Sequence, residues 1–450
     1  MTWKTDYQPL LKLIIPLILA GMIGGLVYFF ISLFLAKLGS EVLAAGALVS
    51  WLYSVFVVII FGILGSVNIL ISHLYGKNDY QAIVQVVRDG LVLSIILFIP
   101  AFVLFWNMDV IFIYLGQSEA VVNLAKPFLH ALSYALLPYF ILTTFLESLI
   151  GLGHTRVVIR FTLISVTLSI LLSYIFIFGC DYTPTLGISG AGWGITLSYV
   201  ITLLGLILYL WFNKTYKTYF SQIFSFQPCK HFLELMQIGF PLGLMYCVEV
   251  GFFFVLTLII GRYGHELLAA NQVAMQFLGP LLGGIFSIAQ GISVRIGHLL
   301  GSDDNKKAKN VVNIGIKCSV LFVLGFSLLN WCCPQWLISF DFALDNPNYA
   351  TIIYHATHFL YLSGIFQILE AIRVALFGVL RALKQTKICL ISSVVTFWLL
   401  GLPLGLFLEH SCFQYGIGIW LGVIISTIIS IIWLWFYLQC LASRHEIQNT

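Results

Sequence analysis

Long apolar runs, separated by short polar connections, divide this sequence into twelve segments. Each run has about 20 residues or more, the length that an α-helix needs to cross the hydrocarbon layer of a membrane. The connections carry the Gly, Pro, Asn and Asp residues that are typical of turns. The predicted spans are residues 10–36, 48–72, 87–106, 124–150, 157–179, 190–212, 236–260, 271–294, 311–333, 353–380, 388–408 and 417–440.

The composition supports a membrane protein. Of the 450 residues, 60% are hydrophobic and only 9% are charged, and the mean hydropathy is +1.01. Soluble domains carry roughly 25% charged residues. The first apolar run, 10–36, is longer than the roughly 7–15-residue core of a signal peptide, so we interpret it as the first span. The sequence therefore predicts an all-α polytopic membrane protein.

An internal repeat relates the two halves of the chain. The pairs at a spacing of 225 residues include Pro16 with Pro241, Gly39 with Gly264, Glu41 with Glu266, and His73 with His298. Six spans separate the copies, an even number, so both copies have the same orientation in the membrane. We predict two pseudo-symmetric six-helix lobes, residues 1–212 and 236–450, joined by a cytoplasmic linker over residues 213–235. Such parallel repeats suit alternating access, and we expect Pro16 and Pro241 to kink their helices as hinges.

Positive charges are strongly biased toward one side of the predicted membrane. With both termini on the same side, that side receives 17 of the 22 Lys and Arg residues, whereas the opposite side receives Lys37, Lys126 and Arg262. The positive-inside rule then places both termini in the cytoplasm. We expect a multi-pass protein of the plasma membrane, which in a bacterium is the inner membrane. The 17 residues are Lys4, Lys12, Lys77, Arg88, Arg156, Arg160, Lys214, Lys217, Lys230, Arg295, Lys306, Lys307, Lys309, Arg381, Lys384, Lys387 and Arg444.

Two acids and one Arg lie deep within predicted spans of the second half. Glu249 is near the middle of span seven, where the repeat has Gly24 in the first half, and Glu370 lies in span ten. A charged side chain is costly at that depth, which makes it a functional candidate by default. We expect Glu249 and Glu370 to take up a coupling ion, H⁺ or Na⁺. Arg373, three residues after Glu370, also permits a purely structural ion pair.

Other polar residues favour structural roles. Glu147 lies about one turn from the cytoplasmic end of span four, and we interpret it as an interfacial residue near Arg156. His355 and His358 are three residues apart but lack further metal ligands, so we expect packing and no metal site. The sequence contains no nucleotide-binding loop and no hydrolase triad. We therefore expect no enzyme activity, no cofactor and no nucleic-acid partner.

Aromatic side chains accompany Glu249 along the chain. Residues 252–254 are all Phe, and Tyr28 lies at the equivalent place in span one. An aromatic wall beside a buried acid suits a lipophilic cation, through apolar contact and cation–π attraction. We assign the substrate cavity to Tyr28, Phe253, Gln272, Phe366 and Arg373.

Several segments resemble the multidrug and toxic compound extrusion (MATE) transporters, particularly the NorM-like branch. These segments are GFPLGLMYCVEV at 239–250, LLAANQVAMQF at 267–277, ISVRIGHLLG at 292–301, GISGAGWGIT at 187–196 and FQILEAIRVALFGVLRALKQTK at 366–387. The resemblance covers nearly the whole chain. It implies two six-helix lobes around a central cavity and the export of organic cations in exchange for inward H⁺ or Na⁺. It also places Glu249 and Glu370 where such transporters carry acids in spans seven and ten.

The first half departs from the pattern of that family. The acid that is common in span one, fifteen residues after the proline, is Ile31 here. The Asn or Asp region of span five offers only Ser169 and Ser173. Phe366 stands where a Tyr is often found, one turn before the span-ten acid. The resemblance therefore implies that ion coupling rests on the second half.

Three alternatives stay open beside an antiporter of small organic cations or amphiphiles that works as a monomer in the lipid bilayer. An exporter of one specific metabolite, such as a siderophore, would share this sequence pattern, because the cavity walls set the substrate. A flippase for lipids or lipid-linked sugars would need a cationic groove, for which only Arg373 and Lys317 are available. A membrane enzyme such as an acyltransferase would need a His or Cys beside an acid, and His130 and His154 have no convincing partner.

Overall fold

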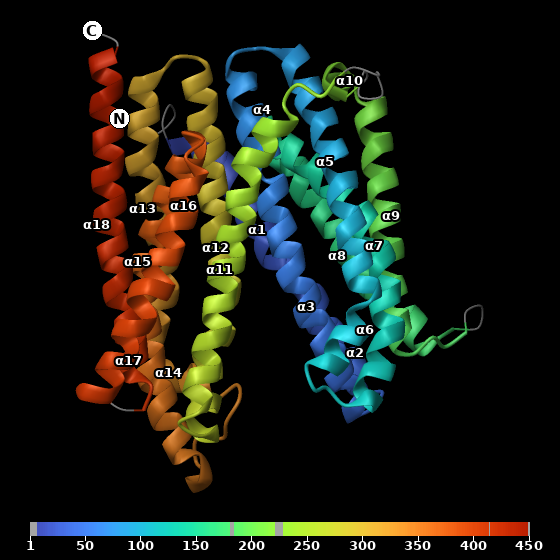
Figure 1. Ribbon diagram of the computed structural model, residues 1–450, viewed down its shortest axis with the longest axis vertical. Coiled ribbons are helices and arrows are strands. Elements are labelled where there is room, and N and C mark those ends of the chain that lie inside the picture. Colours follow the sequence, from blue (N-terminus) through green and yellow to red (C-terminus); the bar gives the residue numbers. More distant parts are fainter. Residues whose placement is uncertain (1–6, 181–183, 221–227, 414, 449–450) are drawn as a thin grey trace. The chain divides into compact units, whose positions relative to one another are not determined.

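A computed structural model describes residues 7–180, 184–220, 228–413 and 415–448, and for residues 442–448 the backbone alone. These residues are almost entirely helical and contain no β-strand (Figure 1). Twelve of their helical segments are long and apolar enough to cross a membrane, which confirms the predicted fold class. The spans are Gln8–Ala36, Ser40–Gly76, Tyr80–Trp106, Glu119–Gly151, Thr155–Phe178, Ile188–Phe212, Phe232–Gly261, His265–Gly301, Asn305–Cys332, Pro347–Ala382, Thr386–Ser411 and Ile417–Leu441.

Several observed spans are longer than the apolar runs that predict them. The second span covers Ser40–Gly76 rather than 48–72, and the eighth covers His265–Gly301 rather than 271–294. The apolar run marks only the part of a helix that needs an apolar surface. Backbone hydrogen bonds continue the helix through the polar residues at its ends.

The chain forms two compact units, and each is assembled from separate stretches of sequence. Unit 1 consists of Met1–Ile18, Leu244–Leu299 and Asp304–Thr450, and unit 2 consists of Leu19–Gly243 and Leu300–Asp303. The lobes expected at 1–212 and 236–450 stay a prediction, because a sequence half and a spatial unit are different divisions of the chain.

Two helices at matching places in the repeat pass from one unit to the other. The chain leaves unit 1 within α1 (Gln8–Gly24), after Ile18, and leaves unit 2 within α11 (Phe232–Gly261), after Gly243. Ile18 and Gly243 are themselves separated by the 225 residues of the internal repeat. The repeat in the sequence is therefore also visible in the way in which the chain is divided between the units.

Unit 2 contains the end of α1, all of α2 to α10, the first part of α11 and the last two residues of α12 (His265–Gly301). The bounds are α2 Leu26–Ala36, α3 Ser40–Leu64, α4 Ser66–Gly76, α5 Tyr80–Trp106, α6 Met108–Tyr114, α7 Glu119–Gly151, α8 Thr155–Phe178, α9 Ile188–Phe212 and α10 Lys214–Phe220. The GISGAGWGIT motif opens α9. Its Gly190 lies against the backbone of Phe176 in α8, and Gly194 lies against the backbone of Ser173. Small residues at such contacts let helix backbones approach closely in a membrane.

Unit 1 contains the remaining helices and the site described below. The bounds are α12 His265–Gly301, α13 Asn305–Cys332, α14 Pro334–Ile338, η2 Pro347–Tyr349, α15 Ala350–Ala382, α16 Thr386–Ser393, η3 Val394–Gly401, α17 Leu402–Ser411 and α18 Ile417–Gln448. Its core includes the fully buried rings of Phe252, Phe359, Phe366, Phe397 and Trp420.

The eleventh span changes its helical form in the middle. Between α16 and α17, the segment η3 (Val394–Gly401) is a π-helix, in which backbone hydrogen bonds reach one residue further than in an α-helix. Such segments are rare and often occur at functional sites. Here η3 follows directly after Ser393, which contributes to the site.

Large apolar side chains lie exposed along many of these helices. Ile99 of α5, Leu204 of α9 and Leu399 of η3 are among them. A soluble protein rarely leaves so much apolar surface in contact with water. The exposure is what helices that face hydrocarbon require, and it supports the assignment of the spans.

Candidate functional site

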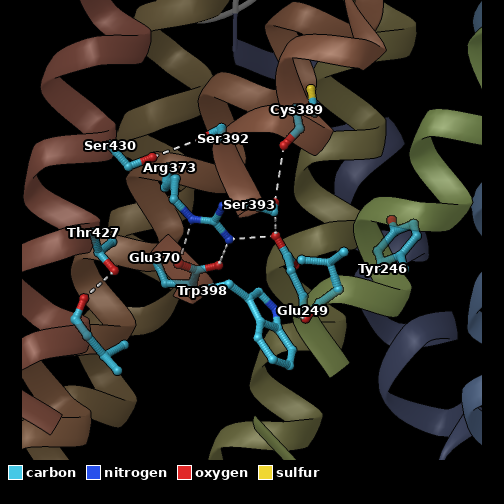
Figure 2. Close-up of polar contacts among 12 residues, drawn as sticks. Tyr246, Glu249, Glu370, Arg373, Cys389, Ser392, Ser393, Trp398, Thr427 and Ser430 are labelled. Carbon is cyan, nitrogen blue, oxygen red and sulfur yellow. Dashed lines mark hydrogen bonds and ion pairs between the residues drawn. The ribbon is translucent and has the colours of Figure 1, made fainter. Parts of the chain in front are cut away.

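The three charged residues expected deep in spans seven and ten come together in unit 1 (Figure 2). Glu249 belongs to α11, whereas Glu370 and Arg373 are one turn apart on α15. Nη2 of Arg373 donates to Oε1 of Glu249 (2.8 Å) and to Oε1 of Glu370 (2.5 Å). Nε of Arg373 donates to Oε2 of Glu370 (2.9 Å). One guanidinium is thus shared by two carboxylates, and we call these residues, with Ser393, the charged cluster.

Ser393, the last residue of α16, completes the charged cluster. Its hydroxyl lies 2.6 Å from Oε1 of Glu249, to which it donates, and it accepts from Nη1 of Arg373 (3.3 Å). Sequence reasoning missed this residue, because a Ser in an apolar span commonly bonds to a carbonyl of its own helix. Ser393 has that option too, since the carbonyl oxygen of Cys389 is 3.2 Å away. The Ser392–Ser393 pair within an apolar run was the available signal.

The charged residues of the cluster are almost completely buried. Glu249 is 5% exposed, Glu370 is 1% exposed and Arg373 is fully buried. The rings of Phe377 and Phe397 lie 4.6 Å and 4.7 Å from the guanidinium carbon of Arg373. Burying an isolated charge costs several kcal/mol, on the order of the whole stability of many domains. Mutual pairing, charge-assisted hydrogen bonds and the aromatic faces offset that cost here.

The segment η3 fixes the position of α11 beside the charged cluster. Nε1 of Trp398 donates to the carbonyl of Val248 (3.0 Å), directly before Glu249. One residue earlier in η3, the ring of Phe397 stacks on Phe252 with a centroid distance of 4.8 Å. The π-helical segment thus supplies two adjacent aromatic residues that both face α11, and together they orient the Glu249 carboxylate toward Arg373.

The residues assigned to the substrate cavity fall into different places. The rings of Phe253 and Phe366 are in contact at 5.9 Å, and Phe253 also contacts Phe397, which flanks the charged cluster. Gln272 lies exposed on α12. Tyr28 belongs to α2 in unit 2 and is therefore described separately from the others. Unit 1 thus brings together Phe253, Phe366 and the charged cluster.

Glu147 occupies a buried place, where an interfacial one was expected. It is 1% exposed, and its Oε2 accepts a hydrogen bond from Nδ2 of Asn68 (2.5 Å). The reason is that α4 covers the end of α7. Gly151, one turn after Glu147, lies so close to Ile71 of α4 that an added Cβ would be 2.8 Å away. Position within an apolar run therefore underestimates the burial of this acid.

The first-half positions that differ from the family pattern carry no charge. Ile31 is fully buried on α2. The hydroxyl of Ser169 bonds to that of Ser198 (2.5 Å), and Ser173 donates to the carbonyl of Ala191 (3.2 Å). Within the described ranges, no group of three or more His, Cys, Asp and Glu side chains is placed to hold a metal ion.

The chain is similar to known proteins over nearly its whole length. The profile of the MatE family matches residues 16–175 and 241–407. A "Probable multidrug resistance protein NorM" of Mesorhizobium japonicum is 27% identical over 435 residues, which cover 94% of this chain and 91% of that protein. A protein of the same name from Pseudomonas syringae pv. tomato is 27% identical over 442 residues, covering 97% of this chain and 95% of that protein.

Solved structures give the same fold. An outward-facing multidrug resistance MATE family transporter of the MOP superfamily superposes with a TM-score of 0.86 at 18% identity, covering 97% of this chain and 96% of that one. The eukaryotic MATE transporter AtDTX14 superposes with a TM-score of 0.83 at 19% identity, covering 96% and 95% of the two chains. The family match includes both halves of the internal repeat, with Glu249 and Glu370 inside the second matched region.

Proposed function

The chain belongs to the MatE family of multidrug transporters, and we propose that it is a secondary antiporter that exports organic cations or amphiphilic compounds in exchange for H⁺ or Na⁺. The observation that carries this proposal is the charged cluster of Glu249, Glu370, Arg373 and Ser393. Acids buried within membrane spans mark ion pathways and proton relays in transporters. The curated relatives are named as multidrug resistance proteins, which supports a small-molecule substrate.

The exchange follows from the charge of the carboxylates. With the cavity open to the outside, Glu249 and Glu370 take up the coupling ion, which neutralises the site and releases the cationic substrate. After reorientation the ion leaves to the cytoplasm, the negative charge returns, and the next substrate binds. Coupling of this kind requires that each ligand bind the two conformations with different free energies. Within unit 1, the rings of Phe253 and Phe366 are the aromatic contacts that we propose for the substrate beside the charged cluster.

The hinge role of Pro16 and Pro241 is part of the same proposal. Each proline lies inside a helix, two residues before the point at which the chain passes from one unit to the other. A proline inside a helix removes a backbone hydrogen bond and kinks the helix. Bending at these two matched positions would let the units move while each keeps its own packing.

The location of the protein is proposed from the charge bias. The chain is a multi-pass membrane protein of the MatE family. The excess of Lys and Arg on one side supports cytoplasmic termini. The similarity to bacterial proteins supports the inner membrane of a bacterium. The protein would act there as a monomer.

The test is transport of a fluorescent organic cation into proteoliposomes, with a pH gradient and a Na⁺ gradient imposed separately. We expect one gradient to drive accumulation by the wild type, and Glu249→Gln to abolish it. Glu119→Gln is the matched control, because it neutralises an exposed acid at the start of α7. Equal transport by the wild type and Glu249→Gln, or no transport by folded wild type under either gradient, would contradict the proposal.

A further inference from the structure

Building on the proposed antiport, we propose that Arg373 is a tethered cation that fills the place of a coupling metal ion, so that the cluster exchanges one proton for its substrate and does not use Na⁺. The proposal concerns which ion the site accepts and how many charges it exchanges. It rests on the hydrogen bonds, the enclosure and the charge of the cluster.

The hydrogen bonds of Arg373 use most of the acceptor capacity of the two acids. A guanidinium has five N–H donors in a fixed planar fork. In this site Nε and Nη2 hold both oxygens of Glu370, and Nη2 also reaches Oε1 of Glu249. Nη1 donates to the hydroxyl of Ser393. Three of the four carboxylate oxygens thus already accept hydrogen bonds from a permanent cation.

Burial and two aromatic rings hold the guanidinium of Arg373 in this place. Arg373 is fully buried, and Phe377 and Phe397 each lie within 5 Å of its guanidinium carbon, at 4.6 Å and 4.7 Å. An Arg does not lose its proton in proteins, so its charge is constant through the cycle. Only the carboxylates can therefore change the charge of the cluster.

The charge of the cluster sets the stoichiometry. Two ionised carboxylates and one guanidinium leave a single net negative charge, which one proton or one monovalent organic cation neutralises. The titratable and charged groups that face Glu249 from the neighbouring elements are Arg373, Glu370 and Arg381 of α15 and Cys389 of α16. This balance counts only the charged cluster: Arg381 lies outside it, because its Nη2 donates to the hydroxyl of Tyr246 (3.2 Å), one turn before Glu249 on α11, rather than to either acid. A second negative charge for a second ion is not supplied by this group.

One oxygen remains for the proton. Among the residues that the structure describes, Oε2 of Glu249 has no hydrogen-bond donor, whereas its Oε1 accepts from Arg373 and Ser393. Glu249 is also the more exposed of the two acids, at 5% against 1% for Glu370. A proton needs only this single oxygen, so the cluster can take it up without releasing Arg373.

A Na⁺ ion makes different demands on the site. Hard metal cations in proteins are surrounded by several oxygen ligands at short distances. Of the four carboxylate oxygens, only Oε2 of Glu249 is not already bound to an N–H or O–H donor among the described residues, so with Arg373 in place the two acids offer Na⁺ a single oxygen ligand. Replacing Arg373 by an uncharged residue should therefore open the site to Na⁺.

The experiment compares Na⁺ binding by the wild type and by Arg373→Gln. Full-length protein in lipid nanodiscs is titrated with radioactive Na⁺, with choline keeping the ionic strength constant at a mildly alkaline pH. We expect no saturable Na⁺ binding by the wild type and saturable binding by Arg373→Gln. In the variant, Na⁺ should weaken binding of the fluorescent organic cation about tenfold, because the two ligands then compete for one doubly negative site.

Two further variants control for the charge itself. Lys317→Gln removes an exposed positive charge from the span formed by α13 and should leave the protein insensitive to Na⁺. Arg373→Lys keeps the buried charge and should also remain insensitive. This variant, with the wild type, decides the question if Arg373→Gln does not fold.

The outcomes separate this proposal from the antiport on which it rests. Saturable Na⁺ binding by the wild type, or transport driven by a Na⁺ gradient alone, would overturn the role of Arg373 and leave the antiport standing. A folded Arg373→Gln that ignores Na⁺ would also overturn it. No transport by folded wild type under a pH or a Na⁺ gradient would instead overturn the proposed function.

Discussion

The two copies of the internal repeat use matching prolines and glycines but differ in charge at their centres. In the second copy, Glu249 meets Glu370 and Arg373 in the middle of unit 1. In the first copy, the matching residue is Gly24, where an added Cβ would meet nothing within 4 Å. The prolines and glycines that shape the helices are thus duplicated, and the buried acid is not. The comparison teaches that packing and chemistry have separated within one repeated framework.

The polar groups buried in unit 2 hold helices together, whereas the charged cluster of unit 1 also keeps a carboxylate oxygen available. The hydroxyls of Ser94 and Thr144 bond to each other at 2.6 Å, linking α5 to α7 without any charge. The buried Asp89 accepts from the backbone N–H of His231 (2.7 Å) and from Arg88 (3.2 Å), which ties α5 to the residue that precedes α11. An acid committed to a backbone N–H anchors the chain, whereas the Glu249 carboxylate keeps one oxygen available.

The largest effect, a loss of stability, should come from removing the guanidinium of Arg373, which the two acids share. Arg373→Leu leaves two buried acids without a counter-charge, and breaking a buried ion pair on one side costs about 3–5 kcal/mol. We expect a large fall in the thermal unfolding temperature of the purified protein in detergent. Lys317→Leu, at an exposed position, is the control. Equal unfolding temperatures for the two variants would show that the charged cluster does not stabilise unit 1.

A smaller loss of stability is expected from placing a larger side chain at the helix contacts of unit 2. Gly194→Leu forces a side chain against the backbone of Ser173, and overpacking of this kind costs roughly 1–3 kcal/mol. Gly24→Leu, where there is open space, should change the unfolding temperature much less. The pair of variants therefore tests whether the glycines of the first half serve packing. A larger loss from Gly24→Leu would reverse the assignment.

Protonation of His154 in unit 2 should change the stability of the protein and not its transport activity. Burial lowers the pKa of His154, which lies between two spans and 3.2 Å from the hydroxyl of Tyr216. Because the unfolded chain binds the proton more tightly, stability is full above the ordinary pKa of about 6.5 and declines as pH falls below it. The loss should stay below about 1 kcal/mol, since the ring is only partly buried. The free energy of unfolding, measured from pH 7.5 to pH 5, about the range of this titration, should depend less on pH in His154→Gln than in the wild type.

The smallest expected effect is that of moving the acid to the first copy. Gly24→Glu in a Glu249→Gln background restores a carboxylate at the matching position of the repeat. We expect no recovery of gradient-driven transport, because a carboxylate there would not have the guanidinium and hydroxyl that hold Glu249. Uptake of the fluorescent cation into proteoliposomes measures this. Recovery of transport would mean that the acid alone, without its partners, carries the coupling.

The sequence predicted the spans well because each depends on a long apolar run that a membrane requires. It also indicated Glu249, Glu370 and Arg373, since charges within such runs stand out. It missed Ser393, which contacts Glu249 (Figure 2), because a Ser in an apolar span commonly bonds to a carbonyl of its own helix.

Glu147 shows a second kind of miss, which concerns burial. Its place near the end of an apolar run suggested an interface, but the covering helix α4 comes from a distant part of the chain. Contacts between helices that are far apart in sequence are set by side-chain packing. Apolar patterning within one helix carries no information about them.

Counting protons tests whether the charged cluster of unit 1 exchanges one proton for one substrate cation. The purified protein in weakly buffered nanodiscs is titrated with the fluorescent organic cation while a pH indicator records release. We expect about one proton released per bound cation by the wild type and by Glu119→Gln, and none by Glu249→Gln. Release by Glu249→Gln equal to that of the wild type, or binding by the wild type without any release, would contradict it.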